Sequence, residues 1–263
     1  MKIKKALVTG GTSGIGLAIC EELLQLGVEV YSVSRNPKKI NPQTNFYQLP
    51  LDLSDLNAAS QFGGKFIEQY GTPDLLVNNA GYGAFYEWKE FPREEIEKQI
   101  SVLLTAPVLI CKSFAPKMEN IEQSTIVNIT SLATLYPLPY MPLYNACKSG
   151  LSSFTQSMML EYKTLKWIDF RLGDIRTSFN KSAPKQAEES QSDSMKRAWK
   201  QIEKQLNESP LPQVAAKQIL RSLKKGSDGT IYGGGFFQAR LAPFFESLLT
   251  NLMVREILKF RYN

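Results

Sequence analysis

Two residues that could carry out acid–base chemistry, Tyr144 and Lys148, stand four positions apart in the stretch YNACK. Positions i and i+4 of a helix share one face, so the phenol and the amine would meet. The chain has no histidine, the usual general base near neutral pH. A lysine cation about 5 Å away is worth about 3 kcal/mol at an effective dielectric of about 20, which could lower the pKa of a phenol by roughly two units. The pair predicts a tyrosine acid or base tuned by a lysine. The alternative is a surface tyrosine beside a salt-bridging lysine.

A glycine-rich turn, TGGTSGIG, lies between a short apolar run and a segment with helical periodicity. Gly10 permits a tight turn, Gly14 permits close approach of a pyrophosphate, and Gly16 lets the helix pack on the strand. The free N–H groups at the helix start would face the anion. This placement predicts a dinucleotide site, with a bare turn as the alternative.

The end of the second predicted strand offers Ser34 and Arg35 where a site for NAD usually offers an acid. A cation and a hydroxyl favour a 2′-phosphate, so we expect NADP(H) rather than NAD; the alternative is a solvated arginine. Asp52, in LDLSD, could accept from the adenine amino group or cap a helix that begins near Ser54. Both interpretations stay open at this point.

Composition limits the classes of function. The 263 residues are 43% hydrophobic, enough for a proper core, and the net charge of +6 suits a solvated basic surface or an anionic cofactor, with no basic block to indicate nucleic acid. Three scattered cysteines argue against disulfides or zinc, and no carboxylate cluster has metal-ligand spacing. Because no run of 18 apolar residues exists, we expect a cytoplasmic protein that at most touches a membrane surface.

Short apolar runs alternate with helical patterns along the chain. This alternation predicts one α/β domain over residues 1–263, a doubly wound parallel sheet of about seven strands with helices on both faces, which binds its ligand beyond the carboxyl ends of the strands. The expected strands are Ala6–Thr9, Val28–Val33, Phe46–Leu49, Leu75–Asn78, Thr125–Ile129, Ile168–Leu172 and Ile231–Tyr232.

Two segments interrupt the alternation. A polar insert around residues 178–210 carries an amphipathic pattern, which predicts either a helix docked on the core or a lid over a pocket. The C-terminal segment 241–263 is rich in apolar residues, with basic residues near its end. We expect it to pack on its own chain or on a second subunit, to contact lipid, or to form a wall of an apolar substrate pocket.

With these motifs in order, residues 1–180 resemble the short-chain dehydrogenase/reductase family. TGGTSGIG is similar to its cofactor motif, NNAG at 78–81 to its fourth-strand motif, and Ser131 precedes YNACK at the family's spacing. The resemblance implies that Tyr144 is the general acid/base, that Lys148 holds the nicotinamide ribose, and that Ser131 steadies the substrate carbonyl. The full set of cofactor contacts that we predict is Gly10, Thr12, Ser13, Gly14, Ile15, Gly16, Ser34, Arg35, Asp52, Leu53, Asn79, Ala80, Gly81, Tyr144, Lys148, Ile175 and Thr177.

Two positions depart from the family pattern. Leu103 replaces an asparagine that helps to hold a relay water, and Leu172 replaces a proline. The retained catalytic triad favours an NADP(H)-dependent oxidoreductase, and the departures keep open a catalytically weak or inactive nucleotide-binding regulatory protein.

The substrate is expected to be a small carbonyl or alcohol. The residues that flank the predicted site are mostly apolar or aromatic, which favours a lipophilic compound. Those expected pocket residues are Tyr82, Phe85, Leu132, Leu135, Tyr136, Tyr140 and Met141. The resemblance also implies a homodimer or homotetramer.

Overall fold

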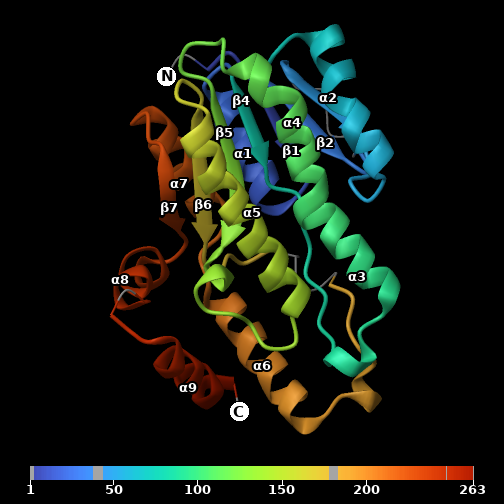
Figure 1. The fold of residues 1–263 in the computed structure, drawn as a ribbon, viewed down its shortest axis with the longest axis vertical. Helices are drawn as coiled ribbons and strands as arrows, with labels where there is room; N and C mark the ends of the chain where they lie inside the picture. Colours follow the sequence, from blue (N-terminus) through green and yellow to red (C-terminus); the bar gives the residue numbers. More distant parts are fainter. Residues whose placement is uncertain (1–2, 38–43, 178–182, 247, 263) are drawn as a thin grey trace.

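The computed structural model describes residues 3–37, 44–177, 183–246 and 248–262, and it contains a single seven-stranded sheet in the order β3-β2-β1-β4-β5-β6-β7 (Figure 1). Every neighbouring pair is parallel, as the alternation of strands and helices predicted. The strands are β1 Lys5–Thr9, β2 Glu29–Ser34, β3 Phe46–Pro50, β4 Leu75–Asn78, β5 Thr125–Ser131, β6 Lys166–Leu172 and β7 Gly229–Gly233.

The strand order reverses at β1, since β2 and β3 extend the sheet on one side and β4 to β7 on the other. A crevice opens at such a switch point beyond the carboxyl ends of the strands, and the chain that leaves β1 there is the glycine turn. The central strands β4 and β5 are buried along their whole length, as expected for a parallel sheet covered on both faces.

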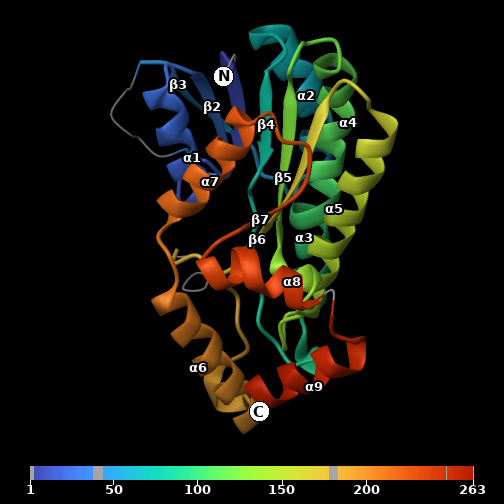
Figure 2. The same cartoon turned by 90° about the vertical axis from the view of Figure 1, so that its left-hand side faces the viewer.

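Two layers of helices cover the sheet (Figures 1 and 2). Side chains of α1 and α7 share one apolar cluster with the sheet, and those of α2, α4 and α5 share the other. The fold is therefore the doubly wound α/β architecture that was expected. The helices of the two layers are α1 Gly14–Gln25, α7 Pro212–Lys224, α2 Leu56–Tyr70, α4 Ala106–Met118 and α5 Pro142–Glu161.

Local sequence signals set where these helices begin. The Asp55 carboxylate accepts a hydrogen bond from the Ala58 N–H and caps α2. Asp52 does not cap this helix, because its Oδ1 accepts instead from the backbone and hydroxyl of Ser54, at 2.9 and 2.8 Å. That contact removes the capping interpretation of Asp52. Prolines occupy the first turns of α5 and α7, where their missing N–H costs nothing.

The helix α3, Arg93–Ile100, runs through a π-helical turn at Ser101–Thr105 into α4. Within the described ranges, this run of residues 93–118 is the one stretch whose length and mean hydropathy of 1.4 would suit a membrane crossing. Half of its apolar window is buried inside the protein, in the core cluster that covers the sheet. Its packing is that of a core helix. This favours the prediction from the sequence that the chain does not span a membrane.

Three further helices, α6 Asp193–Glu208, α8 Ala242–Glu246 and α9 Asn251–Tyr262, lie around the carboxyl-terminal end of the sheet (Figures 1 and 2). Ser192 caps α6, because its hydroxyl accepts from the Met195 N–H, and α6 contacts α9. Its inner face packs on Phe85, Met141 and Tyr262. The predicted insert thus contains a docked amphipathic helix, and its residues 178–182 lie outside the described part of the chain.

Short helical turns complete the chain. They are Trp88–Glu90, Leu132–Thr134, Glu188–Ser190 and the π-helical turn Phe237–Leu241.

A buried polar network ties β6 to β5 and α5. The Asp169 carboxylate, on β6, accepts from Ser152 Oγ at 2.7 Å and from Arg171 Nε at 2.9 Å, and it also accepts from the Thr130 hydroxyl. Asp169 is fully buried, so these bonds replace its hydration. This network fixes α5 against the two strands that carry the candidate site.

We expect Asp169→Asn to lower the free energy of unfolding by about 3 kcal/mol, because it leaves Arg171 without its buried counter-charge. Urea denaturation measures the loss. As a control, Glu97→Gln breaks the exposed Arg93–Glu97 pair and should cost at most about 0.5 kcal/mol. Equal losses in the two variants would contradict the role assigned to the network.

Candidate active site

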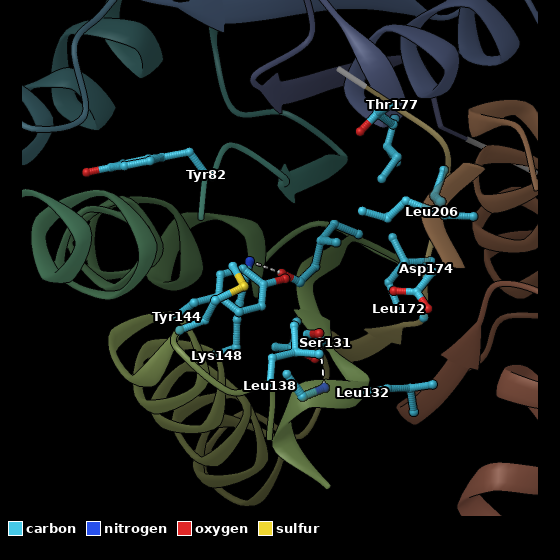
Figure 3. A pocket seen from close by; sticks show the side chains of 18 of the residues that line it. Tyr82, Ser131, Leu132, Leu138, Tyr144, Lys148, Leu172, Asp174, Thr177 and Leu206 are labelled. Carbon is cyan, nitrogen blue, oxygen red and sulfur yellow. Dashed lines mark hydrogen bonds between the residues drawn. The ribbon is translucent and has the colours of Figure 1, made fainter. Parts of the chain in front are cut away.

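A cavity of about 1040 Å³ lies beyond the carboxyl ends of the strands. The glycine turn and the ends of β2, β4, β5 and β6 form one part of its wall, and side chains from α5, α6 and the C-terminal segment form the rest. Figure 3 shows Tyr144, Lys148 and Ser131 among its lining side chains. The switch point of the sheet thus carries a large, partly open cavity.

Tyr144 and Lys148 both reach this cavity from α5, one helical turn apart. Lys148 Nζ lies 5.9 Å from the centre of the Tyr144 ring and donates to the Ile129 carbonyl oxygen at 2.6 Å. Tyr144 is hydrogen-bonded to the side chain of Ser131, at the end of β5. The fold therefore brings all three residues of the predicted triad together.

Burial sets the acidity of this tyrosine. It raises the pKa of Tyr144 above its ordinary value; the hydrogen bond with Ser131 opposes the rise, and the charge of Asp174 adds to it. The net direction is opposite to the lowering that the sequence led us to expect from Lys148. Lys148 does not contribute the expected lowering, and its amine donates to the Ile129 carbonyl oxygen.

The Lys148 amine is 5% exposed, and this burial lowers its pKa to about 8. The charges of Cys147 and Asp169 act in the opposite direction and only partly offset the burial. Near neutral pH the amine is a cation that gives up its proton far more readily than a surface lysine.

The glycine turn has the shape that a pyrophosphate needs. Gly10 and Gly14 have φ angles of +70° and +52°, which side chains rarely permit. A Cβ on Gly16 would lie 2.3 Å from the Gly10 carbonyl oxygen, so Gly16 serves the packing of α1 against the turn and does not line the cavity. These features fit a dinucleotide on the remaining residues of the turn.

The NNAG segment is locked onto this turn. Thr9 Oγ1 accepts from the backbone N–H groups of Asn79 and Ala80, each at 3.0 Å. Asn79 Nδ2 donates to the Thr9 carbonyl oxygen, also at 3.0 Å. The neighbouring Asn78 donates to Asn128 Oδ1 at 2.8 Å and joins β4 to β5. The motif therefore fixes the two strand ends on either side of the crevice.

Ser34, Arg35 and Asp52 line the far end of the cavity. The Ser34 hydroxyl oxygen is buried and has no hydrogen-bond partner among the described residues, so it is available to a polar ligand. Burial opposes ionisation of Asp52, but the hydrogen bonds from Ser54 and the charge of Arg35 outweigh it and lower the pKa of the carboxyl. This end offers both a cation and a carboxylate.

Sixteen of the seventeen predicted cofactor residues line the cavity, Gly16 being the exception. Of the predicted pocket residues, Tyr82, Leu132, Tyr136 and Met141 also line it. The remaining three, which the structure does not place on its wall, are Phe85, Leu135 and Tyr140.

Phe85 shows why these positions lie off the cavity wall. Its backbone pairs with residues 184–186, and its fully buried ring packs between Tyr140 and Trp199. The ring therefore belongs to the core that holds α6. Tyr140, at a φ of 60°, lies in the same cluster, and Leu135 ends a short helical turn outside the cavity wall.

Sequence reasoning missed several lining residues. Asn145, inside YNACK, accepts from the Leu138 N–H at 3.2 Å and donates to its carbonyl at 2.8 Å, which fixes the loop that brings Leu138 to the cavity. Asp174 follows β6. Gln238 Nε2 donates to the Asp174 carboxylate at 2.6 Å, and Gln238 Oε1 accepts from the Asp174 N–H at 2.9 Å. Gln238 lies 64 residues further along the chain, so no local pattern indicated this contact.

Leu103 and Leu172 are the two residues that we expected to depart from the family pattern. Leu103 is fully buried, and a Cβ on Gly81 would lie 2.8 Å from its Cδ2 and 3.8 Å from Lys148 Nζ. An apolar side chain therefore fills the space near the lysine. Leu172 ends β6 and lines the cavity.

Residues 4–188 match the family model described as short chain dehydrogenase. The chain belongs to this family. Its members include a 3-ketodihydrosphingosine reductase of Bacteroides thetaiotaomicron, 29% identical over 205 residues, which cover 76% of each chain. The similarity to this relative therefore extends over most of the chain.

Solved structures show the same fold. A short-chain dehydrogenase from Streptomyces avermitilis superposes with a TM-score of 0.83 at 22% identity, over 98% of this chain and 97% of the other. An alcohol dehydrogenase from Thermococcus sibiricus was solved with 5-hydroxy-NADP (TM-score 0.73, 22% identity, 90% and 98% covered). A short-chain dehydrogenase/reductase from Burkholderia phymatum was solved with NAD (TM-score 0.76, 20% identity, 99% and 95% covered). The fold thus accommodates both kinds of nucleotide.

The buried Lys148 amine makes the stability of this dehydrogenase depend on pH. Below pH 8 the folded protein bears the full cost of a buried cation. Between pH 8 and 10.5 the folded amine has lost its proton while the unfolded amine still keeps it, so stability rises with pH. We expect the wild type to gain about 3 kcal/mol relative to Lys148→Met across this window. Denaturant titrations of both proteins measure it, and a pH-independent difference would contradict the assignment.

Proposed function

We propose that this short-chain dehydrogenase is an NADP(H)-dependent oxidoreductase that interconverts a lipophilic carbonyl compound and its alcohol. The observation that carries the proposal is the hydrogen-bonded pair of Ser131 and Tyr144, with Lys148 on the same helix face, at a cavity with a dinucleotide-shaped turn. When bound, the nicotinamide supplies or accepts the hydride. The protein supplies the proton and the orientation.

Tyr144 is the proton donor in the reductive direction. Because burial raises its pKa, the phenol is protonated at neutral pH and ready to give its proton to a carbonyl oxygen. The Ser131 hydroxyl, bonded to the same phenol, is placed to donate to that oxygen as negative charge develops. Lys148 holds a ribose hydroxyl and returns a proton to the tyrosine, for which its pKa of about 8 is well matched.

The nucleotide is held along the cavity by the turn around Gly10 and Gly14, which faces the pyrophosphate. Asn79–Gly81 and Leu53 flank the adenosine side, and Ile175 and Thr177 face the carboxamide. Ser34 and Arg35 favour a 2′-phosphate and hence NADP(H) over NAD. Support comes from the unpartnered Ser34 hydroxyl and from the position of Arg35 on the cavity wall. Asp52 is free of the capping role and remains a candidate acceptor for adenine.

The substrate we infer is a lipophilic ketone, aldehyde or alcohol. Tyr82, Leu132, Leu138 and Met141 give this part of the wall an apolar character, and side chains of α6 and α9 extend it. The Bacteroides relative, named for reducing 3-ketodihydrosphingosine, supports this class. Asp174, whose charge reaches Tyr144, suits a substrate with a hydrogen-bond donor near its carbonyl.

Leu103 favours one competing function, a nucleotide-binding regulatory protein with little or no catalysis, because its side chain offers no polar group to a relay near Lys148. Loss of NADPH absorbance with a panel of ketones, aldehydes and quinones separates the two. Nucleotide binding without turnover of any member of the panel would favour the regulatory protein. The cytoplasmic location, the homodimer or homotetramer and the absence of a nucleic-acid partner stay predictions.

We expect Tyr144→Phe to reduce turnover by about two orders of magnitude or more, since it removes only the proton donor, and to leave the affinity for NADPH nearly unchanged. Steady-state rates and nucleotide titration measure the two effects. Tyr162→Phe, which alters a tyrosine packed against Trp167, is the control and should keep full activity. Retained activity in Tyr144→Phe would defeat the assignment.

We expect Arg35→Asp to shift nucleotide preference toward NAD, because a carboxylate repels the 2′-phosphate and can accept from ribose hydroxyls. The ratio of kcat/KM for NADPH to that for NADH measures the shift. The control Arg93→Asp places the same charge change on an exposed helix end. An unchanged ratio in Arg35→Asp would count against the 2′-phosphate site.

A further inference from the structure

Large apolar side chains are concentrated on the surface of the C-terminal segment. In the described part of the chain, ten of the seventeen exposed large hydrophobic residues fall within residues 236–260. We call these ten the apolar rim. They are Phe236, Phe237, Leu241, Phe244, Phe245, Leu248, Leu252, Met253, Ile257 and Phe260. Exposed apolar patches of this kind mark surfaces that bind another protein or a membrane.

The helix α9 has two apolar faces. Val254, Leu258 and Tyr262 line the cavity from its inner face. Met253, Ile257 and Phe260, at i, i+4 and i+7, form a second stripe, of which Ile257 also borders the cavity. The cavity and the contact with α6 account for the inner face, whereas these three side chains remain 50%, 51% and 92% exposed.

The apolar rim also borders the cavity. Phe237, Phe245 and Ile257 line the cavity and are at the same time 57%, 45% and 51% exposed. Figure 2 shows α8 and α9 together on the side of the molecule that faces the viewer. An apolar compound held at this rim would therefore lie at the border of the cavity.

Basic side chains accompany the apolar rim. Residues 236–262 contain four cations and two carboxylates, within a chain of net charge +6. Arg240, Arg255 and Lys259 are exposed, and the single Glu256 carboxylate pairs with both Arg255 at 3.5 Å and Lys259 at 2.9 Å. The surface thus combines exposed phenylalanines with a positive charge, which complements an anionic lipid surface.

Charge distinguishes a bilayer from a second copy of the chain. A two-fold interface places the same patch of each copy against the other, which would bring two surfaces of net positive charge together. An anionic bilayer instead neutralises them. The twelve residues of α9 span about 18 Å, less than the roughly 30 Å of a bilayer core, so this helix can lie in a membrane surface but cannot cross it.

We propose that the apolar rim docks the protein on an anionic lipid bilayer, with α9 lying in the interface, so that lipophilic substrates pass from the membrane into the cavity. The passage of substrate rests on the proposed function, whereas docking itself does not.

Co-sedimentation with vesicles tests the docking. We expect the full chain to bind vesicles of phosphatidylcholine and phosphatidylserine, and to bind vesicles of phosphatidylcholine alone much more weakly. Phe260→Ser should weaken binding about tenfold, because it removes one exposed aromatic side chain from the bilayer. The matched control is Leu160→Ser, which alters an 84% exposed leucine at the end of α5 and should bind like the wild type.

A second pair of variants tests the electrostatic part. The double variant Arg255→Gln with Lys259→Gln should lose affinity for the anionic vesicles, whereas Lys224→Gln with Lys225→Gln removes the same charge at the end of α7 and should lose much less. Absence of binding, binding that Phe260→Ser leaves unchanged, or a dimer that Phe260→Ser dissociates in light scattering would each overturn the proposal.

Activity separates this proposal from the proposed function. In the absence of vesicles, Phe260→Ser should reduce a short water-soluble carbonyl at the wild-type rate, since Phe260 lies outside the cavity wall. Vesicle binding by a chain that reduces no carbonyl would refute the proposed oxidoreductase and leave the docking intact. Carbonyl reduction by a chain that binds no vesicles would refute the docking and leave the oxidoreductase intact.

Discussion

The contact on which the site depends is the hydrogen bond from Lys148 Nζ to the Ile129 carbonyl oxygen. It holds a buried amine 5.9 Å from the centre of the Tyr144 ring. Burial then dominates the electrostatics of both groups, since it raises the pKa of the tyrosine and lowers that of the lysine. The result at neutral pH is a protonated phenol next to an amine that exchanges its proton easily. This arrangement suits proton delivery to a carbonyl without any histidine.

The contact requires that β5 and α5 be held in a fixed relative position. β5 supplies both Ile129 and Ser131, α5 supplies Tyr144 and Lys148, and the buried Asp169 network keeps that helix and strand in register. Opposite them, Thr9 bonds the NNAG segment to the glycine turn. One set of hydrogen bonds thus positions Tyr144, Lys148 and Ser131. A separate set on the same sheet positions the glycine turn at the other end of the cavity.

Local patterns in the sequence were sufficient to predict the sheet and the dinucleotide end of the site, because the glycine turn, NNAG and YNACK each act within a few residues of one strand end. They were insufficient for the substrate end. Whether Phe85 faces the cavity depends on its pairing with residues 184–186, and the role of Asp174 depends on Gln238, both far away in the chain. The acidity of Tyr144 was predicted in the wrong direction because burial could not be read from the spacing of two residues.

The C-terminal segment has two features that the sequence analysis gave as alternatives, a cavity wall and a surface that could contact lipid. The same C-terminal segment forms a wall of the cavity and carries the exposed apolar rim. The apolar and basic border of the cavity would suit the proposed lipophilic substrate if it reaches the protein from a lipid phase. The exposed phenylalanines, costly in water, then have a physical role.

The central claim is that burial keeps the Tyr144 phenol protonated, so that it acts as an acid. Its most direct test is an ultraviolet titration of phenolate in the nucleotide-free protein, taken as the difference between the wild type and Tyr144→Phe. We expect this tyrosine to titrate above its ordinary pKa of 10.0. Phenolate that forms well below that value in the free protein would contradict it.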